Sequence, residues 1–142
     1  GFDRLGTAGV LWLLAALLPC CRPSLPGDLP GLIQALGDND MRIQFAAAED
    51  IAERYGQAGL EKALETGNPT ARARAAQFLG LRYGAAALDS LLKASKDPEP
   101  HVRRWAVIAL KKLSSPSAES RVQEMRADPD KGVATEAQAS DK

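Results

Sequence analysis

The stretch Val102-Arg-Arg-Trp-Ala-Val-Ile-Ala-Leu110 is typical of a helix that packs within an array of similar helices. Its apolar residues fall three and four positions apart, so they lie along one helix face. Two further stretches share the pattern, Ala71-Arg-Ala-Arg-Ala-Ala-Gln-Phe-Leu79 and Ile43-Gln-Phe-Ala-Ala-Ala-Glu-Asp-Ile51, and a weaker copy begins at Val133. The four copies start 28, 31 and 31 residues apart. A nearly constant period of this length indicates repeated structural units.

Glycine and proline mark the ends of these predicted helices. Gly56 and Gly84 follow tyrosines at the ends of the first two, where glycine is a common helix cap. An N-cap residue followed by proline is favoured at a helix start. Such pairs precede the later helices: Asn68-Pro69, Asp97-Pro98 and Asp128-Pro129. In the first repeat, Asp38 takes this place without a proline.

Shorter apolar segments separate the long helices and complete one helical hairpin per repeat. They lie at residues 32–36, 60–64, 88–92 and 122–125. A single hairpin cannot bury its apolar face alone and must stack on its neighbours. The sequence therefore predicts an all-α solenoid of about four hairpins over residues 29–139. The repeats cover approximately 29–56, 57–84, 85–115 and 116–139, and a disordered tail follows at 140–142.

The repeats resemble the HEAT-repeat superfamily, in particular short bacterial repeats of the phycobilisome-lyase type. Those repeats have the pattern Asp-Pro-x-x-Val-Arg-x-x-Ala-Ala-x-Ala-Leu-Gly. Residues 97–110 match it with one extra residue before Val102, and residues 68–80 match it too. The arginine is replaced by Gln44 in the first repeat and by Ala134 in the fourth. The resemblance implies a right-handed α-α superhelix in which the second helix of each hairpin lines a concave binding surface.

Charge is distributed unevenly, although the formal net charge of the chain is zero. Residues 28–70 carry a net charge of −5, residues 71–112 a net charge of +6, and residues 113–142 a net charge of −2. The cationic middle predicts a partner with an acidic surface. The candidate contact residues are Arg72, Arg74, Arg103, Arg104, Trp105 and Lys111. For Arg72 and Arg103, the resemblance implies an alternative, which is pairing with an acidic residue of the adjacent repeat that would stabilise stacking. For Trp105, the alternative is packing between repeats.

Catalytic and metal-binding motifs are not recognisable in the sequence. The one histidine, His101, has no second histidine to complete a zinc site, and hydroxylases built on HEAT repeats use paired His-Glu motifs. We therefore expect a non-catalytic interaction scaffold without a cofactor. Two alternatives stay open. The resemblance to phycobilisome-lyase repeats implies a bilin lyase, and the basic stretch 71–112 suits nucleic acid, against zero net charge and an acidic first repeat.

The N-terminal segment, residues 1–28, has a different character. Residues 8–18 contain no polar side chain, and a helix of that length covers about 17 Å, whereas a bilayer core is about 30 Å thick. The segment resembles an export or lipoprotein signal, with Cys20 or Cys21 as the lipidated residue, followed by a proline-rich linker. A membrane-surface anchor and a capping helix are alternatives. The expected location is the cell envelope or periplasm, with the cytoplasm as the alternative.

Overall fold

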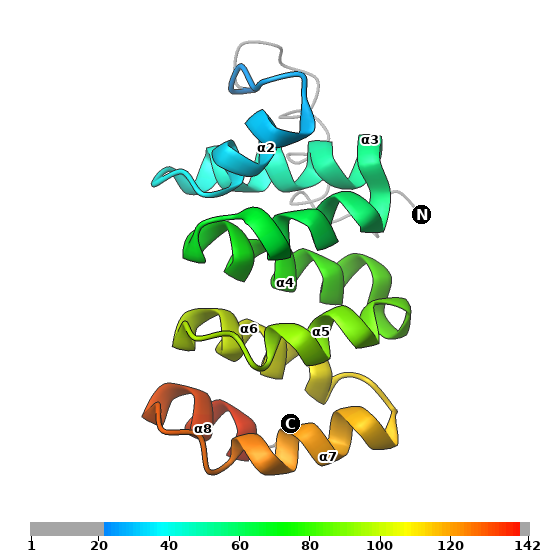
Figure 1. Ribbon diagram of the computed structural model, residues 1–142, viewed down its shortest axis with the longest axis vertical. Helices are drawn as coiled ribbons and strands as arrows, with labels where there is room; N and C mark the ends of the chain where they lie inside the picture. Colours follow the sequence, from blue (N-terminus) through cyan, green and yellow to red (C-terminus); the bar gives the residue numbers. More distant parts are fainter. Residues whose placement is uncertain (1–21, 140–142) are drawn as a thin grey trace, which may run out of the picture.

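The computed structural model describes residues 22–139, and within them the chain forms helices joined by short turns. The helices stack in one column (Figure 1). In chain order they are α2 (Leu29–Leu36), α3 (Met41–Thr66), α4 (Pro69–Tyr83), the 3₁₀ helix η1 (Gly84–Ala87), α5 (Leu88–Ala94), α6 (Pro100–Lys111), α7 (Pro116–Met125) and α8 (Lys131–Gln138). The predicted all-α solenoid is confirmed. The predictions for residues 1–21, with Cys20 and Cys21, and for the tail lie outside the described residues.

Helix α3 consists of two helices that meet at Gly56. This glycine has φ 64° and ψ −155°, a left-handed backbone conformation that a residue with a Cβ adopts at a steric cost. Gly84, at the end of α4, likewise has a φ of 51°. Both predicted helix ends are therefore confirmed. The first half of α3 completes the first hairpin, and its second half begins the next one.

The hairpins build two layers of helices. The second helices of the hairpins pack side by side in the order first half of α3, α4, α6 and α8. The other layer contains α2, the second half of α3, α5 and α7. Because equivalent helices of neighbouring repeats lie next to each other, residues about 30 positions apart in sequence become neighbours in space. Within residues 22–139, no helix combines the length and hydropathy that crossing a bilayer would need.

The core runs between the two layers and repeats the sequence pattern. Ala47, Ala75 and Ala106 hold the same position in three successive second helices, and each is fully buried. Ala137 holds it in α8 and is 2% exposed. A small side chain at this position lets the helices approach closely. One turn further on, leucine or isoleucine fills the space between the layers. Helix α8 is packed through Val133 and Ala137, so the fourth repeat, the weakest in the sequence, forms a hairpin too.

Helices α3, α6 and α8 begin two residues later than the sequence predicted. Their N-caps are Asp40, Glu99 and Asp130. Each expected cap instead accepts a hydrogen bond from the backbone N–H of the residue two positions later in the chain, at 2.8–2.9 Å. These expected caps are Asp38, Asp97 and Asp128. This local bond forms a turn before the helix, which is a common alternative use of an aspartate side chain. Only Asn68 caps its helix as predicted, by accepting the Ala71 N–H at 2.8 Å.

Candidate partner-binding surface

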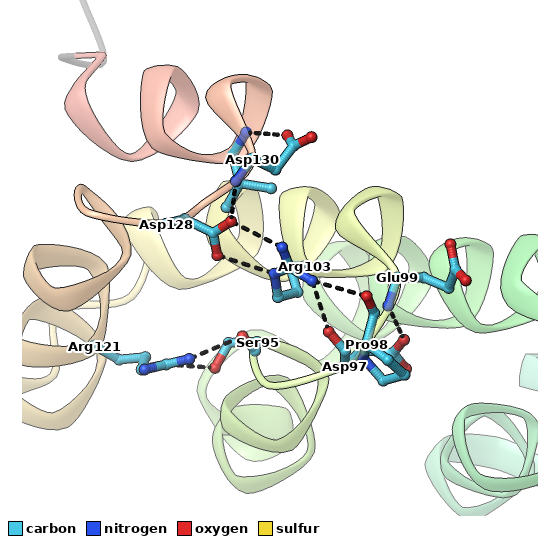
Figure 2. A network of polar contacts seen from close by, with 9 residues as sticks. Ser95, Asp97, Pro98, Glu99, Arg103, Arg121, Asp128 and Asp130 are labelled. Carbon is cyan, nitrogen blue, oxygen red and sulfur yellow. Dashed lines mark hydrogen bonds and ion pairs between the residues drawn. The ribbon is translucent and has the colours of Figure 1, made fainter.

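Arg103 joins the third repeat to the fourth (Figure 2). Its guanidinium donates two hydrogen bonds to the Asp128 carboxylate, at 2.9 and 2.8 Å. It also donates to the backbone carbonyls of Asp97 and Pro98, both at 3.0 Å. The side chains of Arg103 and Asp128 are only 14% and 8% exposed. The planar fork of arginine suits such paired contacts, which lysine cannot reproduce.

Arg72 makes the equivalent contact one repeat earlier. It donates to the Asp97 carboxylate at 2.8 and 3.1 Å and to the Gly67 carbonyl at 3.0 Å. In the first repeat, Gln44 replaces the arginine, and its amide donates to the carbonyl of Asp38. In three successive second helices, the side chain at this position thus donates a hydrogen bond to a backbone carbonyl of a connecting turn. Two of these side chains also donate to a carboxylate of the following repeat.

The ion pairs also shift the pKa values of their members. Hydrogen bonds from Arg103 hold the pKa of the Asp128 carboxyl below its ordinary value. Asp128 in turn raises the pKa of Arg103, and the hydrogen bonds to Asp97 raise the pKa of Arg72. Both arginines form ion pairs with the following repeat, and their side chains are largely buried. The structure therefore favours the stacking role that the sequence left open for Arg72 and Arg103.

Arg74 lies on the outer side of α4 and contacts uncharged groups. Its guanidinium sits 4.5 Å from the centre of the Phe45 ring, a distance typical of a cation–π contact. It donates to the Gln44 side-chain oxygen at 2.8 and 3.1 Å and also to Gln77. Burial lowers the pKa of Arg74. Among the residues that the structure describes, no carboxylate forms an ion pair with this half-buried guanidinium, and its nitrogens donate to glutamine oxygens instead.

The cations of α6 differ in how far they reach the surface. The Lys111 side chain is 9% exposed and donates a hydrogen bond to the backbone carbonyl of Glu136 at 3.0 Å. This bond connects the end of α6 to α8. Arg104 is 54% exposed, and its closest carboxylate oxygen, also on Glu136, is 3.7 Å away. Lys112 is exposed, and no carboxylate of residues 22–139 lies at ion-pair distance from it. Arg104 of α6 and Lys112, which follows the helix, are therefore the cations of this region best placed to meet a partner.

A shallow groove lies between α4 and α6. We call it the α4/α6 groove. Helix α4 contributes Gln77, Gly80 and Leu81. The other wall is formed by Trp105, Ile108, Ala109 and Lys112. Leu81 is 64% exposed, which is unusual for a large apolar side chain in a folded domain. The groove thus combines an apolar floor with a cation at its edge.

Sequence reasoning named Trp105 as a candidate contact, with packing between repeats as its alternative, and did not single out the other lining residues as contacts. Leu81 and Ile108 were missed because the repeat pattern was used to find buried residues. The signal that could have found them is an apolar residue lying off the buried face of its helix, four residues or fewer from a cation. Of the other predicted residues, Arg74 contacts Phe45 and Gln44 of α3 and Arg104 faces Glu136 of α8, whereas Arg72, Arg103 and Lys111 are engaged between repeats.

The stacked hairpins can be compared with known families at this point. The family described as HEAT repeats matches residues 57–140. The chain belongs to this family. The match starts at the second half of α3 and continues through the last described helix. It therefore covers Arg72, Arg103 and the α4/α6 groove.

A solved structure shares the fold. Human deoxyhypusine hydroxylase, solved in complex with glycerol, is 20% identical, with a TM-score of 0.61. The superposition covers 95% of this chain and 53% of that chain, so these HEAT repeats span about half the length of the hydroxylase. At this identity, the likeness shows the fold alone. No curated protein sequence matches the chain.

His101 lies exposed in the first turn of α6, as expected from the sequence. Across residues 22–139, no three His, Cys, Asp or Glu side chains are grouped so that they could hold a metal ion. A second depression lies on the layer of first helices. Its polar lining residues are Glu61, Asp89, Ser90, Lys93 and Asp97. Ser90 donates a hydrogen bond to the Glu61 carboxylate at 2.7 Å. Hydrogen bonds from Gln57 and Ser90 lower the pKa of that carboxyl, which makes it a weaker base for activating a nucleophile.

Proposed function

We propose that this protein is a non-catalytic scaffold that binds a protein partner on the second-helix surface. This surface consists of the outward-facing side chains of the first half of α3, α4 and α6. The observation that supports this most directly is that the exposed Leu81 and the half-buried Trp105 line one groove together with the exposed cation Lys112. Exposed apolar groups that cluster and are rimmed by polar residues mark interaction sites on soluble domains.

Three further features support the proposal. Met41 and Phe45, 59% and 37% exposed, extend the apolar part of the surface onto α3. Phe45 also packs edge-on against Phe78 with ring centres 5.6 Å apart, so it is a rigid contact group. Aromatic residues and arginine are the residue types enriched in energetically dominant contacts. HEAT repeats commonly use an extended surface of this kind to bind proteins.

Photocrosslinking in cells tests where a partner sits. With p-benzoylphenylalanine in place of Leu81, we expect a discrete crosslinked protein adduct on illumination. The same amino acid in place of Lys93, which is exposed on the opposite layer, is the matched control and should give none. No adduct at Leu81, or equal adducts at both positions, would contradict the proposal. A nuclease-sensitive adduct at Leu81 would replace it by the nucleic-acid alternative.

We also propose that residues 1–21 attach this scaffold to the cell envelope. The support is the apolar run at residues 8–18, followed by the adjacent Cys20 and Cys21. We expect the native protein to begin at one of these cysteines, with lipid attached, or to retain the segment in a membrane fraction. Mass spectrometry of the native N-terminus measures this directly. A chain that keeps residues 1–21 and stays in the soluble fraction would contradict envelope attachment.

A further inference from the structure

Helices α4 and α6 are cationic and contain no acidic residue. Together with Lys112, which follows α6, they carry seven cations: Arg72, Arg74, Arg82, Arg103, Arg104, Lys111 and Lys112. Within the described part of the chain, the carboxylates found at ion-pair distance from these groups are those of Asp97, Asp128, Glu49 and Glu136, and Glu99 and Asp130 interact with Arg72 and Arg103 at longer range. Among residues 22–139, Arg74 and Lys112 have no such partner, and Glu136 is shared by two cations. The surface therefore keeps an excess of positive charge next to the groove.

The size of the α4/α6 groove restricts what can occupy it. Its volume is about 210 Å³, which is below the roughly 300–1,000 Å³ of most small-molecule pockets. Its floor is formed by the faces of Gly80, Ala109 and Ile108 and is apolar. A phosphate backbone would leave that floor unused. A single bulky apolar side chain of a partner would cover the floor while the rest of the partner stays on the surface.

Two exposed cations lie on either side of the groove residue Ile108 along the α6 axis: Lys112 lines the groove, and Arg104 faces Glu136 of α8 at 3.7 Å. Arg104 stands immediately before Trp105, and Lys112 stands four residues after Ile108. Eight residues of helix separate these two cations, which corresponds to about 12 Å along the helix axis. Carboxylates of a partner would therefore pair with both cations when they lie about this far apart, one on each side of the apolar anchor.

We infer that the α4/α6 groove binds an acidic amphipathic segment of a protein partner. One large apolar residue of the segment enters between Leu81 and Trp105. Carboxylates on both sides of it pair with Arg104 and Lys112. This inference rests on the proposed scaffold function and specifies the chemistry of its partner. It does not involve the ion pairs of Arg72 and Arg103, whereas Arg104 would exchange its 3.7 Å contact with Glu136 for a carboxylate of the partner.

Selection from a random 16-residue peptide library displayed on phage tests the inference with the purified full chain. We expect the selected peptides to be enriched in Asp and Glu around one Leu, Ile, Phe or Trp. Binding of the selected peptides should weaken about tenfold or more with Leu81→Asp, and about threefold or more with Lys112→Glu or Arg104→Glu. The charge reversal Lys93→Glu, on the opposite layer, should leave the affinity unchanged.

The outcomes separate this inference from the proposed function. Leu81 and Lys112 are exposed, so these variants should keep the helical content of the wild type, and Leu81→Ser provides a second groove variant. Peptides without acidic enrichment, or peptides that bind all variants equally, would overturn the inference. If Leu81 photocrosslinks still trap a protein, the scaffold function stands and only the partner chemistry is wrong.

Discussion

Replacing Arg103 by alanine is expected to lower the free energy of unfolding by about 3 kcal/mol. The substitution removes four hydrogen bonds at once and leaves the 8%-exposed Asp128 carboxylate without its counter-ion. An unpaired, largely buried charge is costlier than the loss of a surface pair. Equilibrium urea denaturation followed by circular dichroism measures the effect. Arg103→Lys should recover only part of the lost unfolding free energy. Lysine keeps the positive charge but lacks the planar guanidinium that donates paired hydrogen bonds.

Arg104→Ala is the matched control for this prediction. The residue is adjacent, of the same type and also faces a carboxylate of the fourth repeat. It is 54% exposed, however, and its closest ion-pair distance is 3.7 Å. Exposed pairs of this kind contribute about 0–1 kcal/mol. Equal losses for the two variants would show that the network in Figure 2 does not stabilise the stack.

The pH dependence of the same pair has a definite sign. Arg103 holds the pKa of Asp128 below its ordinary value of 3.8 in the folded protein. The resulting stabilisation is fully present above the unfolded pKa and is lost as the pH falls through the folded pKa. The difference in unfolding free energy between the wild type and Asp128→Asn should therefore be constant near neutral pH and shrink below about pH 4. A difference that grows on acidification would exclude this contribution.

The sequence was sufficient to predict the repeats because their determinants are local. The period of apolar residues, the left-handed glycines at 56 and 84, and the small residues at equivalent positions each act within one hairpin. The starts of α3, α6 and α8 were misplaced because each expected cap forms a local turn instead, and for α6 and α8 a non-local contact adds to this. Asp97 and Asp128 can cap a helix or form a turn, and arginines of the preceding repeat hold them in the turn.

The binding surface was predicted less completely than the fold. The sequence identified a cationic region. It could not distinguish the arginines that form ion pairs with an adjacent repeat from those whose side chains are exposed to solvent. Arg103 and Arg104 are adjacent in sequence, yet their side chains are 14% and 54% exposed. That difference depends on the position of Asp128, 25 residues away. The α4/α6 groove likewise depends on how closely two helices approach, which the repeat pattern does not determine.

The closeness of that approach depends on Gly80, and Gly80→Ala is expected to lower the free energy of unfolding by about 2 kcal/mol. A Cβ atom on Gly80 would lie 2.5 Å from the Cβ of Ala109 and 3.5 Å from its Cα. Both contacts are with the adjacent helix α6, which cannot move away without disturbing the buried Leu79 and Leu110. This strain outweighs the gain of up to about 1 kcal/mol that alanine brings within a helix. Denaturant unfolding measures the loss.

The exchanged pair Gly80→Ala with Ala109→Gly provides the decisive control. Ala109→Gly alone should also destabilise, by about 1–2 kcal/mol, because it weakens α6 and removes a largely buried methyl group. In the double variant, the methyl group moves to the opposite helix across the same contact, so the total loss should be about 1 kcal/mol or less. Losses that simply add would mean that the two residues are not in contact. A favourable coupling would show that glycine at position 80 sets the spacing of α4 and α6, and thereby the floor against which a partner's apolar side chain would pack.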